Sequence, residues 1–252
     1  MYINLKYQFY TFCYRNPFLL VPGIADRLNL QPAYNSLQKA IREVDTKHNI
    51  FFEGITWDWF GVGFTKVPGG SAYQNRSVLS YHYYSPPDFS KEHNFEARME
   101  DLKKLKCGGF LTEMFTSGKG FTEMYELFDL ADEKKQSWQG WSYNRNTDES
   151  SITVEDTSRT YPQAVAGNTI SYKFDKDSKD FSLSYSVNSN CKSSRTEIYY
   201  NKMHYSNGFT IDITPSDHVN MSYSDDGFLI YLDHDSTLQD GDVISFAVTA
   251  VM

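Results

Sequence analysis

The chain has 252 residues, of which 40% are apolar, 22% charged and 16% aromatic, and this is the composition of a globular protein. The net charge of −8, without a cluster of Lys and Arg, argues against a nucleic-acid partner. The cysteines (Cys13, Cys107 and Cys191) form neither a disulfide framework nor a metal-binding spacing, and no apolar run approaches the roughly 20 residues of a membrane span.

The first residues of the chain do not predict a signal peptide. Lys6 and Arg15 interrupt the apolar residues, and no small-residue cleavage pattern is present. Asn75 and Asn220 each begin an Asn-x-Ser sequence, the pattern of N-glycosylation, which gives weak support for a secreted glycoprotein.

Helical and strand patterns alternate from about residue 30 to residue 143. An apolar stripe (Leu30, Tyr34, Leu37, Ile41 and Val44) predicts an amphipathic helix, and helical patterns recur at 96–107 and 124–136. Gly108 and Gly109 are expected to end the second of these helices. Strands are predicted at 49–56, 78–84, 108–115 and 137–143. Strands separated by helices indicate parallel βα units.

The pattern changes after residue 143. A polar stretch is followed by seven short runs of alternating residues, bounded by Asp, Asn, Ser and Gly. These runs lie at 169–174, 181–187, 196–201, 209–215, 219–224, 227–234 and 242–251. Such spacing predicts an antiparallel β-sandwich. We expect two domains, residues 1–155 of mixed α/β structure and residues 156–252 of all-β structure.

Functional side chains of parallel βα folds collect where the strands end. Glu53, His82 with Tyr84, Glu113 and Trp141 each lie late in one of the four predicted strands. A carboxylate, an imidazole, a phenol and an indole on one face favour glycosidase chemistry, in which the carboxylate attacks, His and Tyr bind it or the sugar, and Trp stacks on the ring. The structural alternatives stay open: a paired Glu, a satisfied core His or a buried Trp.

Several ordered motifs resemble one known family. NPFLLVPGIADRLNLQPAYNSLQKAIREVDTKHNIFFEGITWDWFGVGFTKVPGG, SYHYYSPP, FLTEMF, SWQGWSY and RTYPQAVAG are similar to the C-terminal half of endoglycoceramidases, which are family 5 glycoside hydrolases that release the glycan of glycosphingolipids from ceramide. The similarity covers roughly residues 16 to 170. It implies strands five to eight of a (β/α)₈ TIM barrel followed by a β-sandwich, and a retaining mechanism with two glutamates.

The resemblance also implies roles for individual residues. Glu113 matches the nucleophile, His82 and Tyr84 its catalytic supports, and Trp141 an aromatic residue that binds the sugar. We expect Glu53 to contact the substrate as well. Met114-Phe115 and GIT at 54–56 depart from the commoner Phe-Gly and Pro-Val-Thr of the family. Neither a cofactor nor a metal is implied.

The second glutamate of the family is not found at its expected place. The acid/base lies in an Asn-Glu-Pro motif shortly before the segment that matches NPFLLVPG, but this chain has MYINLKYQFYTFCYR there and no Asp or Glu before Asp26. General acid catalysis is typically worth about 10² to 10⁴ in rate. We therefore expect this chain alone to be an inactive or barely active fragment. The alternative is a non-catalytic protein that binds carbohydrate or glycolipid.

The loop WDWFGVGF is expected to meet the lipid half of a glycosphingolipid substrate. Trp57, Phe60 and Phe64 would line a slot for ceramide, whereas the structural alternative is a loop folded over its own aromatic side chains. Peripheral contact with membrane lipid is expected on the same ground. For the full-length protein the family implies a secreted, lysosomal or extracellular location. The sandwich is expected to act as a structural buttress or a membrane-docking module.

Overall fold

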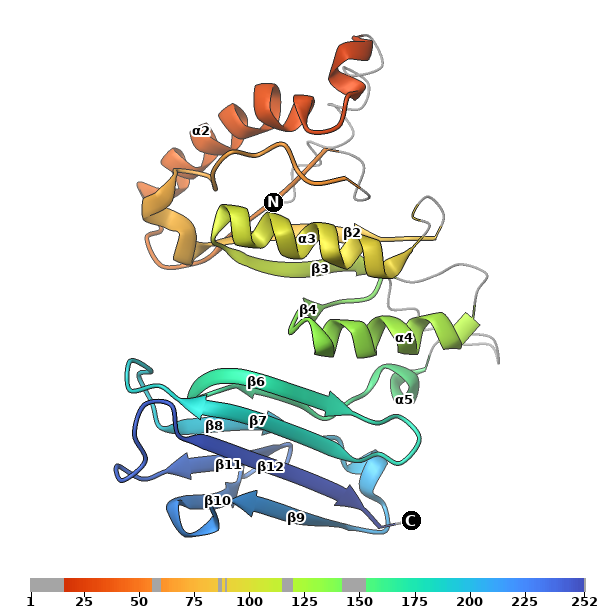
Figure 1. Cartoon of the computed structure of the whole chain (residues 1–252), viewed down its shortest axis with the longest axis vertical. Helices are drawn as coiled ribbons and strands as arrows, with labels where there is room; N and C mark the ends of the chain where they lie inside the picture. Colours follow the sequence, from red (N-terminus) through yellow and green to blue (C-terminus); the bar gives the residue numbers. More distant parts are fainter. Residues whose placement is uncertain are drawn as a thin grey trace. The chain divides into compact units, whose positions relative to one another are not determined.

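The structure is a computed structural model that describes residues 16–55, 60–85, 88, 90–114, 120–141 and 153–251. It divides into two compact units, Met1–Leu127 with Gln136–Tyr143 and Phe128–Lys135 with Asn144–Met252. Each unit is described by itself (Figure 1). The domain limits 1–155 and 156–252 stay a prediction.

The first unit contains a four-stranded parallel sheet in the order β1-β2-β3-β4. Its strands are β1 (Ile50–Glu53), β2 (Ser77–Tyr83), β3 (Gly108–Met114) and β4 (Ser137–Trp138). The parallel βα prediction is confirmed. Strand β4 is shorter than predicted, although the backbone N–H groups of Gln139 and Trp141 still donate to β3, at 2.9 Å to Leu111 O and 3.0 Å to Met114 O.

Helices separate these strands. They are α2 (Gln31–Arg42), which continues a π-helical turn at Asp26–Leu30, α3 (Lys91–Leu105), which packs against β2 and β3, and α4 (Gly120–Glu133), with 3₁₀ turns at Pro17–Leu20 and Ser71–Arg76 (Figure 1). The stripe predicted for the first helix is buried only at its start. Leu30 is 2% exposed but Leu37 is 36%, and Val44 lies beyond the helix at 89%.

The expectation that two glycines end α3 is wrong. The helix ends at Lys106, which takes the left-handed conformation itself at φ 55°, and Gly108 and Gly109 are the first residues of β3. The glycine at 109 has a packing reason instead. A Cβ atom there would lie 2.5 Å from a Leu102 methyl group and 2.4 Å from the Gln136 side-chain oxygen, so any side chain at 109 would require both of these side chains to move.

The core of the first unit is continuous from the sheet to the segment that follows β1. Its buried apolar members are Leu19, Ala25, Leu30, Phe52, Ile55, Val62, Phe64, Val67, Leu79 and Leu105. Burial of apolar area is the main favourable term in folding, and these residues place the loop that leaves β1 directly on the core.

The second unit is an antiparallel β-sandwich, as predicted. Its sheets have the strand orders β10-β11-β8-β5 and β6-β7-β12-β9. The strands are β5 (Tyr161–Ala164), β6 (Gly167–Phe174), β7 (Phe181–Val187), β8 (Arg195–Tyr199), β9 (Phe209–Thr214), β10 (Val219–Tyr223), β11 (Leu229–His234) and β12 (Val243–Ala250). The helix α5 (Val154–Thr157) precedes them, and 3₁₀ turns lie at Lys202–Tyr205 and Ser216–His218. Apolar side chains from both sheets, including Leu183, Ile198, Ile230 and Phe246, form one core.

Strand β5 was not predicted from the sequence. It contains Pro162, which cannot donate to a ladder, and its burial does not alternate. The strand pairs with β8 alone and has a register shift between Pro162 and Ala164. An edge position tolerates both features, because the missing N–H is not needed by a second neighbour.

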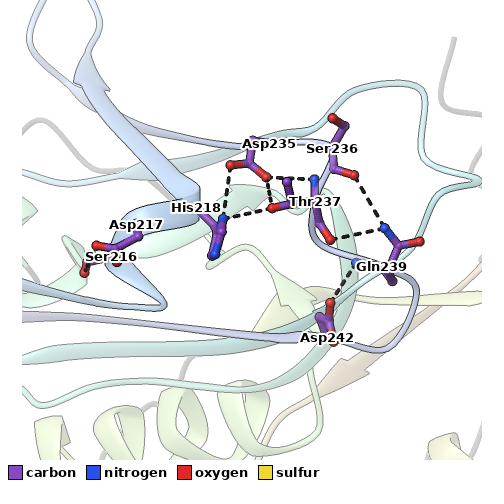
Figure 2. A network of polar contacts seen from close by, with 8 residues as sticks. All are labelled: Ser216, Asp217, His218, Asp235, Ser236, Thr237, Gln239 and Asp242. Carbon is purple, nitrogen blue, oxygen red and sulfur yellow. Dashed lines mark hydrogen bonds and ion pairs between the residues drawn. The ribbon is translucent and has the colours of Figure 1, made fainter.

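Polar contacts fasten two loops at one end of the sandwich (Figure 2). The Asp235 carboxylate lies 3.2 Å from His218 Nδ1 and accepts from the Thr237 backbone N–H at 2.8 Å. Hydrogen bonds from Thr237 and the neighbouring His218 lower the pKa of Asp235 to about 2. The network therefore keeps its carboxylate ionised at neutral pH and joins the turn before β10 to the loop after β11.

Candidate active site

Three side chains named from the sequence meet at the carboxyl end of the parallel sheet. Glu53 is the last residue of β1, His82 lies one residue before the end of β2, and Glu113 lies one residue before the end of β3. The strands β1, β2 and β3 are neighbours and run parallel, so their carboxyl ends share one edge. The predicted convergence of these residues is therefore present in the described structure.

A β-bulge sets the direction of Glu113. Tyr81 pairs with Leu111, but the next residue of β2, His82, pairs with Glu113, so Thr112 and Glu113 together oppose one residue. Leu111 and Met114 are both buried at 0% exposure, three residues apart where a regular strand would bury positions two apart. The extra residue turns Glu113 away from the face of Leu111 and toward His82.

The His82 imidazole lies between two carboxylates. Its Nε2 is 3.4 Å from Glu53 Oε1, and its Nδ1 is 3.6 Å from Glu113 Oε2. The three side chains are only 12%, 15% and 26% exposed, in the order His82, Glu53 and Glu113. Partial burial strengthens electrostatic interactions because it removes screening water.

Tyr84 supplies a hydrogen bond to the same carboxylate. Its hydroxyl donates to Glu113 Oε2 at 3.2 Å. Burial raises the pKa of the Tyr84 phenol well above its ordinary value, and the charge of Glu113 and the hydrogen bond raise it further. The phenol therefore stays protonated and remains a donor. Its contact and that of His82 both fall on Oε2 of Glu113.

The segment 82–84 is held from behind by residues that the sequence did not single out. Asn94, fully buried in the first turn of α3, donates its side-chain N–H to the His82 carbonyl at 3.1 Å. The Asp88 carboxylate accepts from the Tyr84 backbone N–H at 3.2 Å, and the Asp88 N–H donates to the Tyr84 carbonyl at 2.8 Å. The buried face of α3 also carries Arg98 and Asp101, so the sequence pattern gave no signal that marks Asn94.

The loop after β1 is closed at its base by one buried carboxylate. Asp26, 2% exposed, accepts from Ile55 N at 2.8 Å and from Gly63 N at 2.9 Å. Burial raises the pKa of Asp26 even though these two backbone donors act in the opposite sense. A second buried carboxylate, Asp101, accepts from Val62 N with both oxygens, at 3.1 and 3.0 Å.

The aromatic residues predicted for this loop occupy different environments. Phe60 is 48% exposed, as a ligand-contacting residue would be. Phe64 is 1% exposed, and its ring lies edge-on to Phe52 and Tyr34, with centroids 5.2 and 6.0 Å apart. Its assignment to a lipid slot is therefore wrong, because the Phe64 ring is buried in the core and packs against other core rings. Trp57 lies outside the described residues.

Trp141 follows β4, and its backbone N–H is bound to the residue after Glu113. Its side chain is 62% exposed, so the ring is accessible to a ligand. Its role as a sugar platform stays a prediction. Within the described ranges, no group of three or more His, Cys, Asp or Glu side chains is arranged to hold a metal ion. No helix in the same ranges is long and apolar enough to cross a membrane.

Comparison with family models identifies both parts of the chain. Residues 25–147 match the cellulase model of glycosyl hydrolase family 5, and residues 159–248 match the C-terminal domain of glycoside hydrolase family 5.

Comparison with known proteins gives relatives of greater length. An endoglycoceramidase of Hydra vulgaris is 57% identical over 235 residues, which are 87% of this chain and 45% of that protein. An endoglycoceramidase of Cyanea nozakii is 49% identical over 259 residues, 94% of this chain and 51% of the relative. The chain thus spans about half the length of these curated relatives.

Solved structures support the fold. Sterylglucosidase 1 of Cryptococcus neoformans, crystallised with tris, matches with a TM-score of 0.53 and 13% identity over 69% of this chain and 38% of the other. At that identity the likeness concerns the fold alone.

Proposed function

The chain belongs to glycoside hydrolase family 5, and we propose that it carries the nucleophile side of a retaining glycosidase site, with Glu113 as the attacking carboxylate. The observation that carries the proposal is the arrangement around one oxygen. Tyr84 donates to Glu113 Oε2 and His82 faces it, so both hold the carboxylate by one oxygen while the other is left to attack. A retaining mechanism requires such a fixed nucleophile, since it forms a covalent glycosyl-enzyme.

In the mechanism, Glu113 attacks the anomeric carbon as the bond to the leaving oxygen breaks. Water then attacks the same carbon and releases the sugar and the free carboxylate. Donors aimed at a carboxylate stabilise it as an anion, so Tyr84 favours departure of Glu113 in the second step and orients it in the first. Trp141 would stack on the sugar ring.

The general acid is a separate requirement. Retaining glycosidases have carboxyl groups about 5 to 5.5 Å apart, with room for the leaving oxygen between them. Glu53 does not fit this role, because the His82 imidazole occupies the space between it and Glu113. We propose that the acid is contributed by the part of the longer protein that this chain does not cover, where the remaining barrel strands would complete strands five to eight. The chain without it would be inactive or nearly so.

We propose the glycan–ceramide linkage of glycosphingolipids as the substrate. Support comes from the relatives, which are named endoglycoceramidases and are 57% and 49% identical to this chain over the matched residues. The exposed Phe60, within the loop that Asp26 closes, would contact the ceramide portion. Peripheral contact with membrane lipid and an extracellular or lysosomal location belong to the same proposal.

A covalent label tests the nucleophile without needing the general acid. A 2-deoxy-2-fluoro glycoside with a dinitrophenolate leaving group departs unassisted, and its glycosyl-enzyme is long-lived. We expect mass spectrometry to find the sugar on Glu113, no label in Glu113→Gln, and slower labelling in Tyr84→Phe. A label on a different residue, or equal labelling of Glu113→Gln, would contradict the proposal. Binding of a glycolipid by the folded chain without any label would favour the non-catalytic binding protein.

A further inference from the structure

The carboxylate of Glu53 has no part in the reaction as described so far, yet its position is specific. In the β1–β2 register Glu53 pairs with Ser80, and side chains two apart on a strand share a face, so Glu53, Ser80 and His82 lie on one face of the sheet. The Glu53 side chain is 15% exposed, and its Oε1 lies 3.4 Å from His82 Nε2. It therefore approaches the nitrogen opposite the one that faces Glu113.

The number of N–H groups on the imidazole determines whether its contacts with the two carboxylates are attractive or repulsive. A neutral imidazole has one N–H and one lone pair, and only the protonated ring donates from both nitrogens. In a neutral ring, one of the two carboxylates would face a lone pair at 3.4 or 3.6 Å, which is repulsive. With both carboxylates ionised, both contacts are attractive only if His82 is an imidazolium.

The groups in contact with His82 stabilise a positive charge on its ring. They are Glu53 from β1, Glu113 from β3 and the Tyr84 phenol, whose ring centroid is 6.5 Å from the imidazole. Because burial keeps the phenol protonated, it adds no charge. Two carboxylates and one imidazolium leave a net charge of one negative unit in the free site.

The charge of the site changes during the reaction, and here Glu53 becomes important. When Glu113 attacks, its carboxylate becomes a neutral ester and no longer balances His82. A lone imidazolium in a partly buried site would then tend to lose its proton. With Glu53 present, an ion pair remains, so His82 keeps both N–H groups and is ready to stabilise the Glu113 anion when it departs.

We propose that Glu53 is a positioning residue for the nucleophile: its carboxylate pairs electrostatically with the His82 ring on the Nε2 side and keeps it an imidazolium, so that Nδ1 stays directed at Glu113 Oε2. The inference rests on the proposed role of Glu113, but it makes a statement about His82 that holds in the absence of any substrate. The same logic applies to oriented imidazoles elsewhere, whose outer partner fixes the ring and its protonation.

Nitrogen NMR of the six histidines tests the inference directly. His82 is assigned by the signals that His82→Gln removes. We expect both ring nitrogens of His82 to show the shifts of a protonated ring at neutral pH, and Glu53→Gln to convert them to those of a neutral ring. Glu53→Asp, which keeps the charge, should retain the protonated ring. Glu126→Gln, on an exposed carboxylate paired with Lys91, is the matched control and should change nothing.

The 2-deoxy-2-fluoro glycoside label tests the effect of Glu53 on the reaction of Glu113. Loss of the outer partner of a metal-bound imidazole, which is oriented in a comparable way, typically costs about 10- to 100-fold, and we expect Glu53→Gln to slow the labelling of Glu113 by a similar factor. A neutral His82 in the wild type, identical spectra of Glu53→Gln and wild type, or an unchanged labelling rate would each overturn the inference. If the wild type takes no label at all, the proposed nucleophile fails, whereas the spectra still decide the protonation of His82.

Discussion

Phe64 provides a sharp test of the first unit, because the sequence placed it in a ligand slot and the structure places it in the core. The change is Phe64→Ala, and the matched control is Phe60→Ala in the same loop. The ring of Phe64 is 1% exposed and that of Phe60 is 48% exposed. Phe64 also loses edge-on contacts with two rings, Phe52 at 5.2 Å and Tyr34 at 6.0 Å between centroids.

The expected loss follows from burial. Truncating a buried Phe to Ala costs about 3–5 kcal/mol, since transfer free energy is lost and a cavity remains. For a unit of this size, about 3–4 °C of Tm per kcal/mol gives a drop of roughly 10–20 °C. A half-exposed ring loses much less, and we expect Phe60→Ala to cost under about 1 kcal/mol.

The assay must report on the first unit alone. All four tryptophans (Trp57, Trp59, Trp138 and Trp141) precede residue 144, so the sandwich contains none. Selective excitation of tryptophan therefore follows the unfolding of the first unit in urea or on heating. Equal effects of the two substitutions, or a cost of Phe64→Ala under about 1 kcal/mol, would refute the core assignment of Phe64.

Two further predictions concern the backbone and pH. A Cβ at Gly63 would lie 1.8 Å from the Gly23 carbonyl oxygen, so Gly63→Ala should lower the urea midpoint of the first unit far more than Gly108→Ala, whose Cβ would come no closer than 3.7 Å, to Val78; similar midpoints would contradict this. Burial lowers the pKa of His204, so the unfolded chain takes up the proton first and stability is lost as pH falls below about 6.5. The stability difference between wild type and His204→Gln should shrink from about pH 7 to about pH 5 in melts followed by circular dichroism, and a constant difference would argue against it.

The local elements of this fold were predictable because their periodicities are local. The helices α2, α3 and α4 were predicted from helical sequence patterns, and seven of the sandwich strands from alternation bounded by turn residues. The exceptions have physical causes. The edge strand β5 lacks alternation, and the end of α3 depends on a left-handed Lys106, which no glycine signal marks.

Which aromatic side chain of this loop is buried could not be predicted from the residue types in the loop. Phe60 and Phe64 are the same residue type four positions apart, but Asp26 and Asp101 hold the backbone between them against the core. The carboxylates that do this come from helical segments at 26 and 101, distant in the sequence. Which aromatic side chain faces inward is therefore decided by contacts between segments, and not by the loop itself.

The sequence by itself determined the chemistry of the candidate site: a carboxylate, an imidazole and a phenol near the ends of predicted parallel strands, and the family that carries them. Strand alternation alone would place Glu113 on the face of the buried Leu111. The bulge at Thr112 reverses that, and it exists because β3 pairs with β2 in a shifted register. Likewise, the contact of Glu53 with His82 arises only when β1 and β2 lie side by side. Side-chain direction at a strand end depends on hydrogen bonding between strands, and that pairing is a property of the tertiary structure.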